Sequence, residues 1–134
     1  MSVGHVHTVE EKALEILRRA LDLLVEGDVK GAETLITDVP SCEDEYVSGF
    51  SASVRGILNA LRSGDKEFLA NRIRKSPVHL QNEIRRLKET MDSHLLTEWD
   101  RGYFDAWLDY LSGLRRALRQ PDVEEYSVNQ NPEE

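Results

Sequence analysis

Apolar residues recur at intervals of three or four along most of the chain, which is the spacing of one face of an α-helix. Ala13, Leu17, Leu21 and Leu24 follow this pattern in the first segment. Similar stripes predict long helices over about 9–26, 41–63, 77–93 and 97–119, and short ones near 28–36 and 65–73. The pattern therefore predicts an all-α fold of five to six helices, arranged as antiparallel αα-hairpins in a compact bundle.

Polar residues and glycines at the segment ends support these boundaries. Ser or Thr followed three residues later by an acidic residue forms a capping box, and glycine accepts the left-handed conformation that ends many helices. Neither Gly nor Pro separates the last two helices, so one continuous helix stays an alternative there. The predicted starts are Thr8–Glu11, Asp28, Ser41–Asp44, Asp65, Ser76–Pro77 and Thr97–Asp100, and the predicted ends are Gly27, Gly64 and the residue before Pro121.

The stretch 97–119 carries five of the nine aromatic residues of the chain. On a helix its apolar residues cover an arc of roughly 200°, which is wider than one packing face requires. We therefore expect this helix to make contacts on two sides. Because aromatic residues and arginine are favoured at contacts between chains, we predict an interface formed by Trp99, Tyr103, Trp107, Tyr110 and Arg115.

A similar arrangement occurs in 45–63. The patterns Glu45-Tyr46-x-x-Gly49-Phe50 and Glu98-Trp99-x-x-Gly102-Tyr103 match at a spacing of 53. A glycine inside a helix costs roughly 1 kcal/mol relative to alanine, and close approach of another helix is the usual compensation. We predict that the two helices pack in similar ways, with packing against each other as one arrangement. Their small-residue edges are Gly49, Ser53, Gly56 and Ala60 on one helix and Gly102, Ala106 and Gly113 on the other.

A second internal repeat has a spacing of 37 residues. Gly27-Asp28 and Pro40 correspond to Gly64-Asp65 and Pro77, so each unit is a long helix, a turn and a short helix. The segment ALDLLVEGDVKGA resembles the helix-turn-helix step of tetratricopeptide-type repeats. The resemblance covers about a dozen residues and implies an αα-hairpin at this place.

The length of 134 residues suggests a single domain with its own core. We expect a flexible arm over 1–7, one helical domain over 8–119 and a disordered acidic tail over 120–134. The chain has one cysteine, no signal-peptide pattern and no apolar run long enough to span a bilayer. These features predict a cytoplasmic protein with no membrane partner.

The net charge of −8 is distributed unevenly. The segment 120–134 contributes −5, whereas 66–88 carries seven basic and two acidic residues, a balance of +5. Because arginine binds phosphate oxygens well, an anion or nucleic-acid face stays open as an alternative. It would use Arg72, Arg74, Lys75, Arg85 and Arg86.

Candidate catalytic groups are few. Arg101 precedes Asp105 by four residues, so a solvated ion pair on a helix face is the expected arrangement. His5 and His7 form an H-x-H pair in an arm that is expected to be unstructured, which is weak evidence for a metal site. We therefore predict no catalytic residues, no metal and no cofactor. The favoured hypothesis is a small non-enzymatic interaction or assembly protein that associates with itself as a homodimer.

Overall fold

The computed structural model describes residues 8–64 and 77–129, and all of the regular structure in these ranges is helical. This confirms the predicted all-α bundle. The predicted arm 1–7, the short helix near 65–73 and residues 130–134 lie outside the described ranges. The helices are α1 (Val9–Glu26), α2 (Val29–Ile36), α3 (Glu45–Ser63), α5 (Pro77–Ser93) and α6 (Glu98–Asn129).

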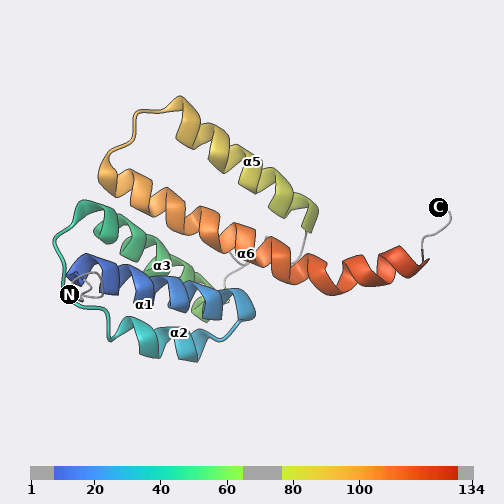
Figure 1. Cartoon of the computed structure of the whole chain (residues 1–134), viewed down its shortest axis with the longest axis horizontal. Coiled ribbons are helices and arrows are strands. Elements are labelled where there is room, and N and C mark those ends of the chain that lie inside the picture. Colours follow the sequence, from blue (N-terminus) through green and yellow to red (C-terminus); the bar gives the residue numbers. More distant parts are fainter. Residues whose placement is uncertain (1–7, 65–76, 130–134) are drawn as a thin grey trace, which may run out of the picture.

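The helices form antiparallel hairpins around three long helices that share one direction. In Figure 1, α2 folds back along α1, and α5 runs antiparallel to α6, as the sequence predicts. Helices α1, α3 and α6 contact one another in pairs and run the same way, and α6 also contacts α5 (Figure 1). Helices α1 and α2 are joined by a short turn and contact each other, which agrees with the expected αα-hairpin. The wider resemblance to tetratricopeptide-type repeats stays a prediction.

Local capping explains where most helices begin and end. The Thr8 hydroxyl accepts a hydrogen bond from the Glu11 N–H at 3.0 Å, and the Glu11 carboxylate accepts one from the Thr8 N–H at 3.1 Å. Thr97 and Asp100 form the same reciprocal pair at the start of α6. This box confirms the predicted break between the last two helices, because a capping residue has non-helical backbone angles. Gly27 ends α1 with a φ of 87°.

The start of α3 differs from the prediction. The Asp44 carboxylate accepts a hydrogen bond from the Val47 N–H at 3.0 Å, so Asp44 is the N-cap and the helix begins at Glu45. The predicted start with Ser41 as the cap was wrong. Both Ser and Asp are good caps, and the aspartate nearer to the apolar stripe of α3 takes the role.

The end of α6 also differs. The sequence prediction ends this helix before Pro121, whereas the structure continues it to Asn129. A proline inside a helix removes one backbone hydrogen bond and bends the helix without always ending it. The axis of α6 changes direction in its C-terminal part (Figure 1).

The hydrophobic core lies where α1, α3 and α6 meet. Its largest fully buried side chains are Leu17, Leu24, Phe50, Ile57, Tyr110, Leu111 and Leu114, and Leu80 joins them from α5. Most members come from the stripes that predicted the helices, because residues three and four apart share one helix face. Helix α5 contributes fewer buried residues, so it covers only one side of α6.

Helices α3 and α6 approach each other at two glycines. A Cβ atom added at Gly49 would lie 1.9 Å from the carbonyl oxygen of Trp99, and one added at Gly102 would lie 2.0 Å from that of Tyr46. The two contacts are equivalent under the 53-residue repeat, since 46 and 49 correspond to 99 and 102. The two helices therefore pack against each other with backbone nearly touching backbone.

Candidate interaction site

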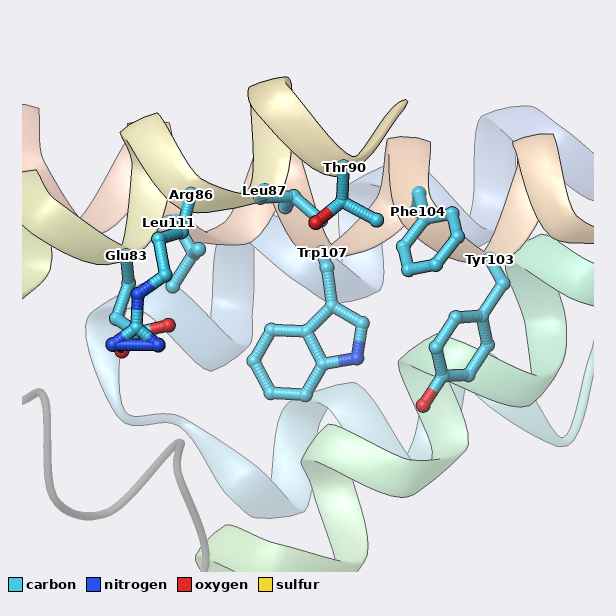
Figure 2. Close-up of a pocket in the computed structure, with 8 residues that line it drawn as sticks. All are labelled: Glu83, Arg86, Leu87, Thr90, Tyr103, Phe104, Trp107 and Leu111. Carbon is cyan, nitrogen blue, oxygen red and sulfur yellow. Dashed lines mark ion pairs between the residues drawn. The ribbon is translucent and has the colours of Figure 1, made fainter. Parts of the chain in front are cut away.

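A groove of about 350 Å³ lies between α5 and α6, and we call it the α5–α6 groove. Its apolar lining comes from Leu87 on α5 and from aromatic residues on α6, with Leu111 beside them. Figure 2 shows Trp107 between the Glu83–Arg86 pair on one side and Phe104 and Tyr103 on the other. The lining residues are Glu83, Arg86, Leu87, Thr90, Tyr103, Phe104, Trp107 and Leu111.

The aromatic side chains of the groove belong to one cluster on α6. Trp99 stacks on Tyr103 with ring centroids 5.3 Å apart, and Tyr103 meets Phe104 edge-on at 5.7 Å. Trp99 is 36% exposed, and Tyr103, Phe104 and Trp107 are partly buried. Leu95, in the turn between α5 and α6, is fully exposed. Apolar surface thus extends from the groove toward the turn.

The predicted interface residues have three different surroundings in the structure. Trp99, Tyr103 and Trp107 keep part of their side chains at the surface. Tyr110 is fully buried in the core of this chain, so it has no surface to offer a second chain. Arg115 donates a hydrogen bond to the Gln81 side chain at 3.3 Å and links α6 to α5.

The residues of the two small-residue edges differ in whether they contact another helix. Gly49 and Gly102 form the close contact described above, and Gly113 faces α1, where an added Cβ would lie 3.1 Å from Val25. Gly56 is exposed, and an added Cβ there would meet no atom within 4 Å. The remaining members, Ser53, Ala60 and Ala106, are buried.

The rim of the groove on α5 is polar. Arg86 forms an ion pair with Glu83 at 3.3 Å, and its side chain is 70% exposed. Arg85 donates a hydrogen bond to Asn82 at 3.2 Å, and Lys88 is exposed. Of the residues proposed for anion binding, Arg85 and Arg86 therefore lie at the surface of α5. Arg72, Arg74 and Lys75 lie outside the described ranges.

A second polar region joins α1, α3 and α6. The Tyr46 hydroxyl donates a hydrogen bond to the Asp105 carboxylate at 2.5 Å, and the Arg18 guanidinium lies 5.6 Å above the Phe50 ring. Among the described residues, Arg101 and Asp105 do not form the predicted ion pair. Arg101 instead lies 3.8 Å from Glu98.

Burial changes the titration of two groups in this region. Burial, and then the hydrogen bond to Asp105, raise the pKa of the Tyr46 phenol well above its usual value, so this phenol keeps its proton. Partial burial raises the pKa of Asp109, although the nearby Arg18 acts in the opposite direction. Asp109 also lines a cleft of about 230 Å³ with Arg18, Asp22 and Arg116, and all four charged side chains there are exposed. Water screens exposed charges strongly, so this cleft is a weak basis for ligand binding.

Groups with metal or nucleophilic chemistry are scattered over the described ranges. No three His, Cys, Asp or Glu side chains within 8–64 and 77–129 are placed to hold a metal ion. His94 Nδ1 lies 2.9 Å from the Thr90 carbonyl oxygen, and Cys42 is partly buried. His5 and His7 lie outside the described ranges. Among the described helices, none is long and apolar enough to cross a membrane.

Comparison of the chain with protein-family models, with curated proteins and with solved structures found no match. The groove therefore has to be interpreted from its own residues. Sequence reasoning identified Tyr103 and Trp107 as candidates, but it did not predict that Glu83, Arg86 and Leu87 complete the same site. The α5 residues follow the i, i+3, i+4 spacing of one helix face, which was the available signal.

Proposed function

We propose that this chain is a non-enzymatic helical interaction and assembly protein that associates with itself through the α5–α6 groove. The observation that carries the proposal is the group of partly exposed aromatic rings at Trp99, Tyr103, Phe104 and Trp107. Aromatic residues are enriched in the centres of protein interfaces, and a contiguous exposed apolar surface is typical of a docking site.

The energetics favour this use of the groove. An aromatic side chain buries roughly 150–250 Å² when it is fully covered. Apolar area removed from water contributes about 25 cal/mol per Å². A partner that covers half of one such ring therefore gains on the order of 2 kcal/mol from it. Covering Tyr103, Phe104 and Trp107 together would offset much of the entropy lost on association.

Sedimentation of the Trp107→Glu variant tests the proposal. We expect the unchanged chain to sediment with the mass of a dimer and Trp107→Glu to sediment as a monomer with its helical circular dichroism retained. A charge at this position would lose part of its hydration on association, which opposes formation of the dimer. Trp107→Phe, which keeps an apolar ring, should remain a dimer.

Val9→Glu is the matched control, because Val9 is an exposed apolar residue on α1, 49% exposed. This variant should sediment like the unchanged chain. A monomeric unchanged chain would contradict self-association. Loss of helical structure in Trp107→Glu would instead assign Trp107 to the core of the single chain.

A second candidate function is nucleic-acid binding. It is favoured by three basic side chains, Arg85, Arg86 and Lys88, that lie exposed within about one turn of α5. A gel-shift measurement with single-stranded and double-stranded RNA and DNA at low salt tests it. Binding that weakens with salt and disappears in Arg85→Gln/Arg86→Gln would support this function. An unshifted nucleic acid at low salt would exclude it.

A further inference from the structure

The α5–α6 groove has two chemically different ends. Trp107 lies between them, with the Glu83–Arg86 ion pair at one end and the rings of Tyr103 and Phe104 at the other (Figure 2). The Arg86 side chain is 70% exposed and that of Glu83 is 23% exposed, so the guanidinium is the more accessible partner of the pair. Tyr103 is also partly exposed. One end therefore offers a cation to the solvent, and the other offers an aromatic ring.

These two ends have complementary chemistry. A guanidinium group is attracted to the electron-rich face of a tyrosine ring, and the contact strengthens when both groups are removed from water. Arginine, tyrosine and tryptophan are also the side chains that most often dominate the affinity of an interface. Trp107 separates Arg86 from Tyr103 within one chain. The aromatic end of a second copy of the groove is the matching surface for Arg86.

A two-fold axis through Trp107 would match both ends at once. Tyr103 precedes Trp107 by four residues and Leu111 follows it by four, so each lies about 6 Å from Trp107 along α6. Leu111 marks the end of the groove that holds Arg86 (Figure 2). Rotation by half a turn about the axis therefore places the arginine end of each copy on the aromatic end of the other. Closed two-fold dimers of this kind are the commonest symmetric assemblies of proteins.

The charge of α5 does not oppose such a contact. Over its whole length, 77–93, the helix carries three basic and three acidic residues, so its net charge is zero with histidine neutral. The whole chain has a net charge of −8. Because like charges repel, two copies meet with less repulsion at α5 than at surfaces that carry the excess of acidic residues. The six charged residues of α5 are Glu83, Arg85, Arg86, Lys88, Glu89 and Asp92.

We propose that two copies of this chain pair through their α5–α6 grooves, with Trp107 of each copy at a two-fold axis and Arg86 of each copy over the partner's Tyr103 ring. This inference rests on the proposed self-association, because it names the partner and the geometry of that contact. The indole rings of the two copies pack on each other at the axis. The guanidinium contacts lie on either side of the indoles and exclude water from them.

Cross-linking of two single-cysteine variants tests the geometry. Both carry Cys42→Ser, and one adds Arg86→Cys while the other adds Tyr103→Cys. A short bismaleimide is the reagent, because a long arginine and a tyrosine meet with their Cα atoms too far apart for a disulfide. In the mixed dimer the two thiols face each other, and the second arginine–tyrosine contact stays intact. We expect the mixture to give a covalent dimer in several-fold higher yield than either variant alone.

The matched control mixes Arg55→Cys with Tyr103→Cys in the same Cys42→Ser background, because Arg55 is an exposed arginine of α3 outside the groove. This mixture should cross-link no more than its components do. If the unchanged chain sediments as a monomer, the groove serves another partner, and the proposed function and this inference both fail. If the unchanged chain is a dimer but the Arg86 mixture cross-links no better than the control, only this geometry fails.

The dimer dissociation constant provides a second measurement. Arg86→Gln removes both guanidinium contacts and should raise the constant at least about tenfold, with the helical circular dichroism retained. Arg85→Gln removes the same charge at the neighbouring position, where Arg85 donates an exposed hydrogen bond to Asn82, and should leave the constant unchanged within about twofold. Equal dissociation constants for the two variants would overturn the contact between Arg86 and the partner's Tyr103.

Discussion

Gly49 and Gly102 are equivalent partners in one helix contact. An added Cβ on Gly49 would lie 1.9 Å from the Trp99 carbonyl oxygen, and one on Gly102 would lie 2.0 Å from the Tyr46 carbonyl oxygen. Neither oxygen can yield easily, because both belong to helix backbone. The closeness of α3 and α6 therefore depends on the absence of side chains at these two positions.

We predict that Gly49→Ala and Gly102→Ala each destabilise the fold by about 3 kcal/mol or more, the upper range for overpacking of a core. The free energy of unfolding in urea, followed by circular dichroism, measures the loss. Gly56→Ala is the internal control, because an added methyl group there meets no atom within 4 Å. It should stabilise the fold by up to about 1 kcal/mol through helix propensity. If the Gly49→Ala and Gly56→Ala variants were equally stable, α3 and α6 would have to lie farther apart than the structure places them.

Tyr46→Phe removes the hydrogen bond that the phenol donates to Asp105 at 2.5 Å. We predict a loss of about 1–2 kcal/mol, because the partly buried carboxylate loses its partner. Tyr103→Phe provides the comparison, because Tyr103 is a partly buried tyrosine of α6 that contacts the rings of Trp99 and Phe104. Thermal unfolding of both variants checks the difference. If Tyr46→Phe unfolds at the same temperature as the unchanged chain, the hydrogen bond between Tyr46 and Asp105 does not stabilise the fold.

Asp109 should make stability depend on pH. Burial raises its pKa above the ordinary value of 3.8 in the folded chain. The folded state then binds more protons than the unfolded state just above that pH, so this group lowers the free energy of unfolding as the pH rises. Asp109→Asn removes this contribution. We predict that the variant gains stability relative to the unchanged chain between pH 4 and pH 7. The gain should stay under about 1 kcal/mol, because the partly buried carboxylate keeps contact with water. Urea unfolding at the two pH values measures it, and a constant difference would refute the raised pKa.

Ser53 is a buried polar residue without a partner. It is 1% exposed, and its hydroxyl makes no hydrogen bond within the described ranges. An unsatisfied buried hydroxyl costs about 1–3 kcal/mol, so Ser53→Ala should leave stability unchanged or raise it by about 1 kcal/mol. Ser51→Ala is the contrasting case, because the Ser51 hydroxyl accepts a hydrogen bond from Arg55 Nε at 3.0 Å. A clear loss of stability in Ser53→Ala would reveal an undetected partner.

Local signals in the sequence predicted most of the fold. The capping box at Thr8 and Glu11 and the glycine end at Gly27 act within one helical turn, so they can be read without tertiary information. The spacing of 53 residues between the two glycine motifs predicted similar packing of α3 and α6, with their mutual contact as one arrangement, and the structure has that arrangement. That prediction succeeded because a glycine inside a helix needs a compensating contact, and the positions of such glycines can be read directly from the sequence.

The contacts between elements were less predictable. Asp105 had two potential partners, Arg101 one turn away on its own helix and Tyr46 on α3, and only the packing of α3 against α6 selects Tyr46. The groove likewise needs the relative position of α5 and α6, which no single-helix pattern contains. At Pro121 the sequence rule was too strict, because a long helix tolerates one missing hydrogen bond.

The reciprocal glycine contact makes the two glycines a single energetic unit. Once an alanine at Gly49 has forced α3 and α6 apart, the space for a second methyl group at Gly102 already exists in part. The second substitution should then cost less than it does alone, and the double variant should be more stable than the sum of the two losses implies. A double-mutant cycle across this contact would thus report how rigidly the backbone holds the spacing of the two helices.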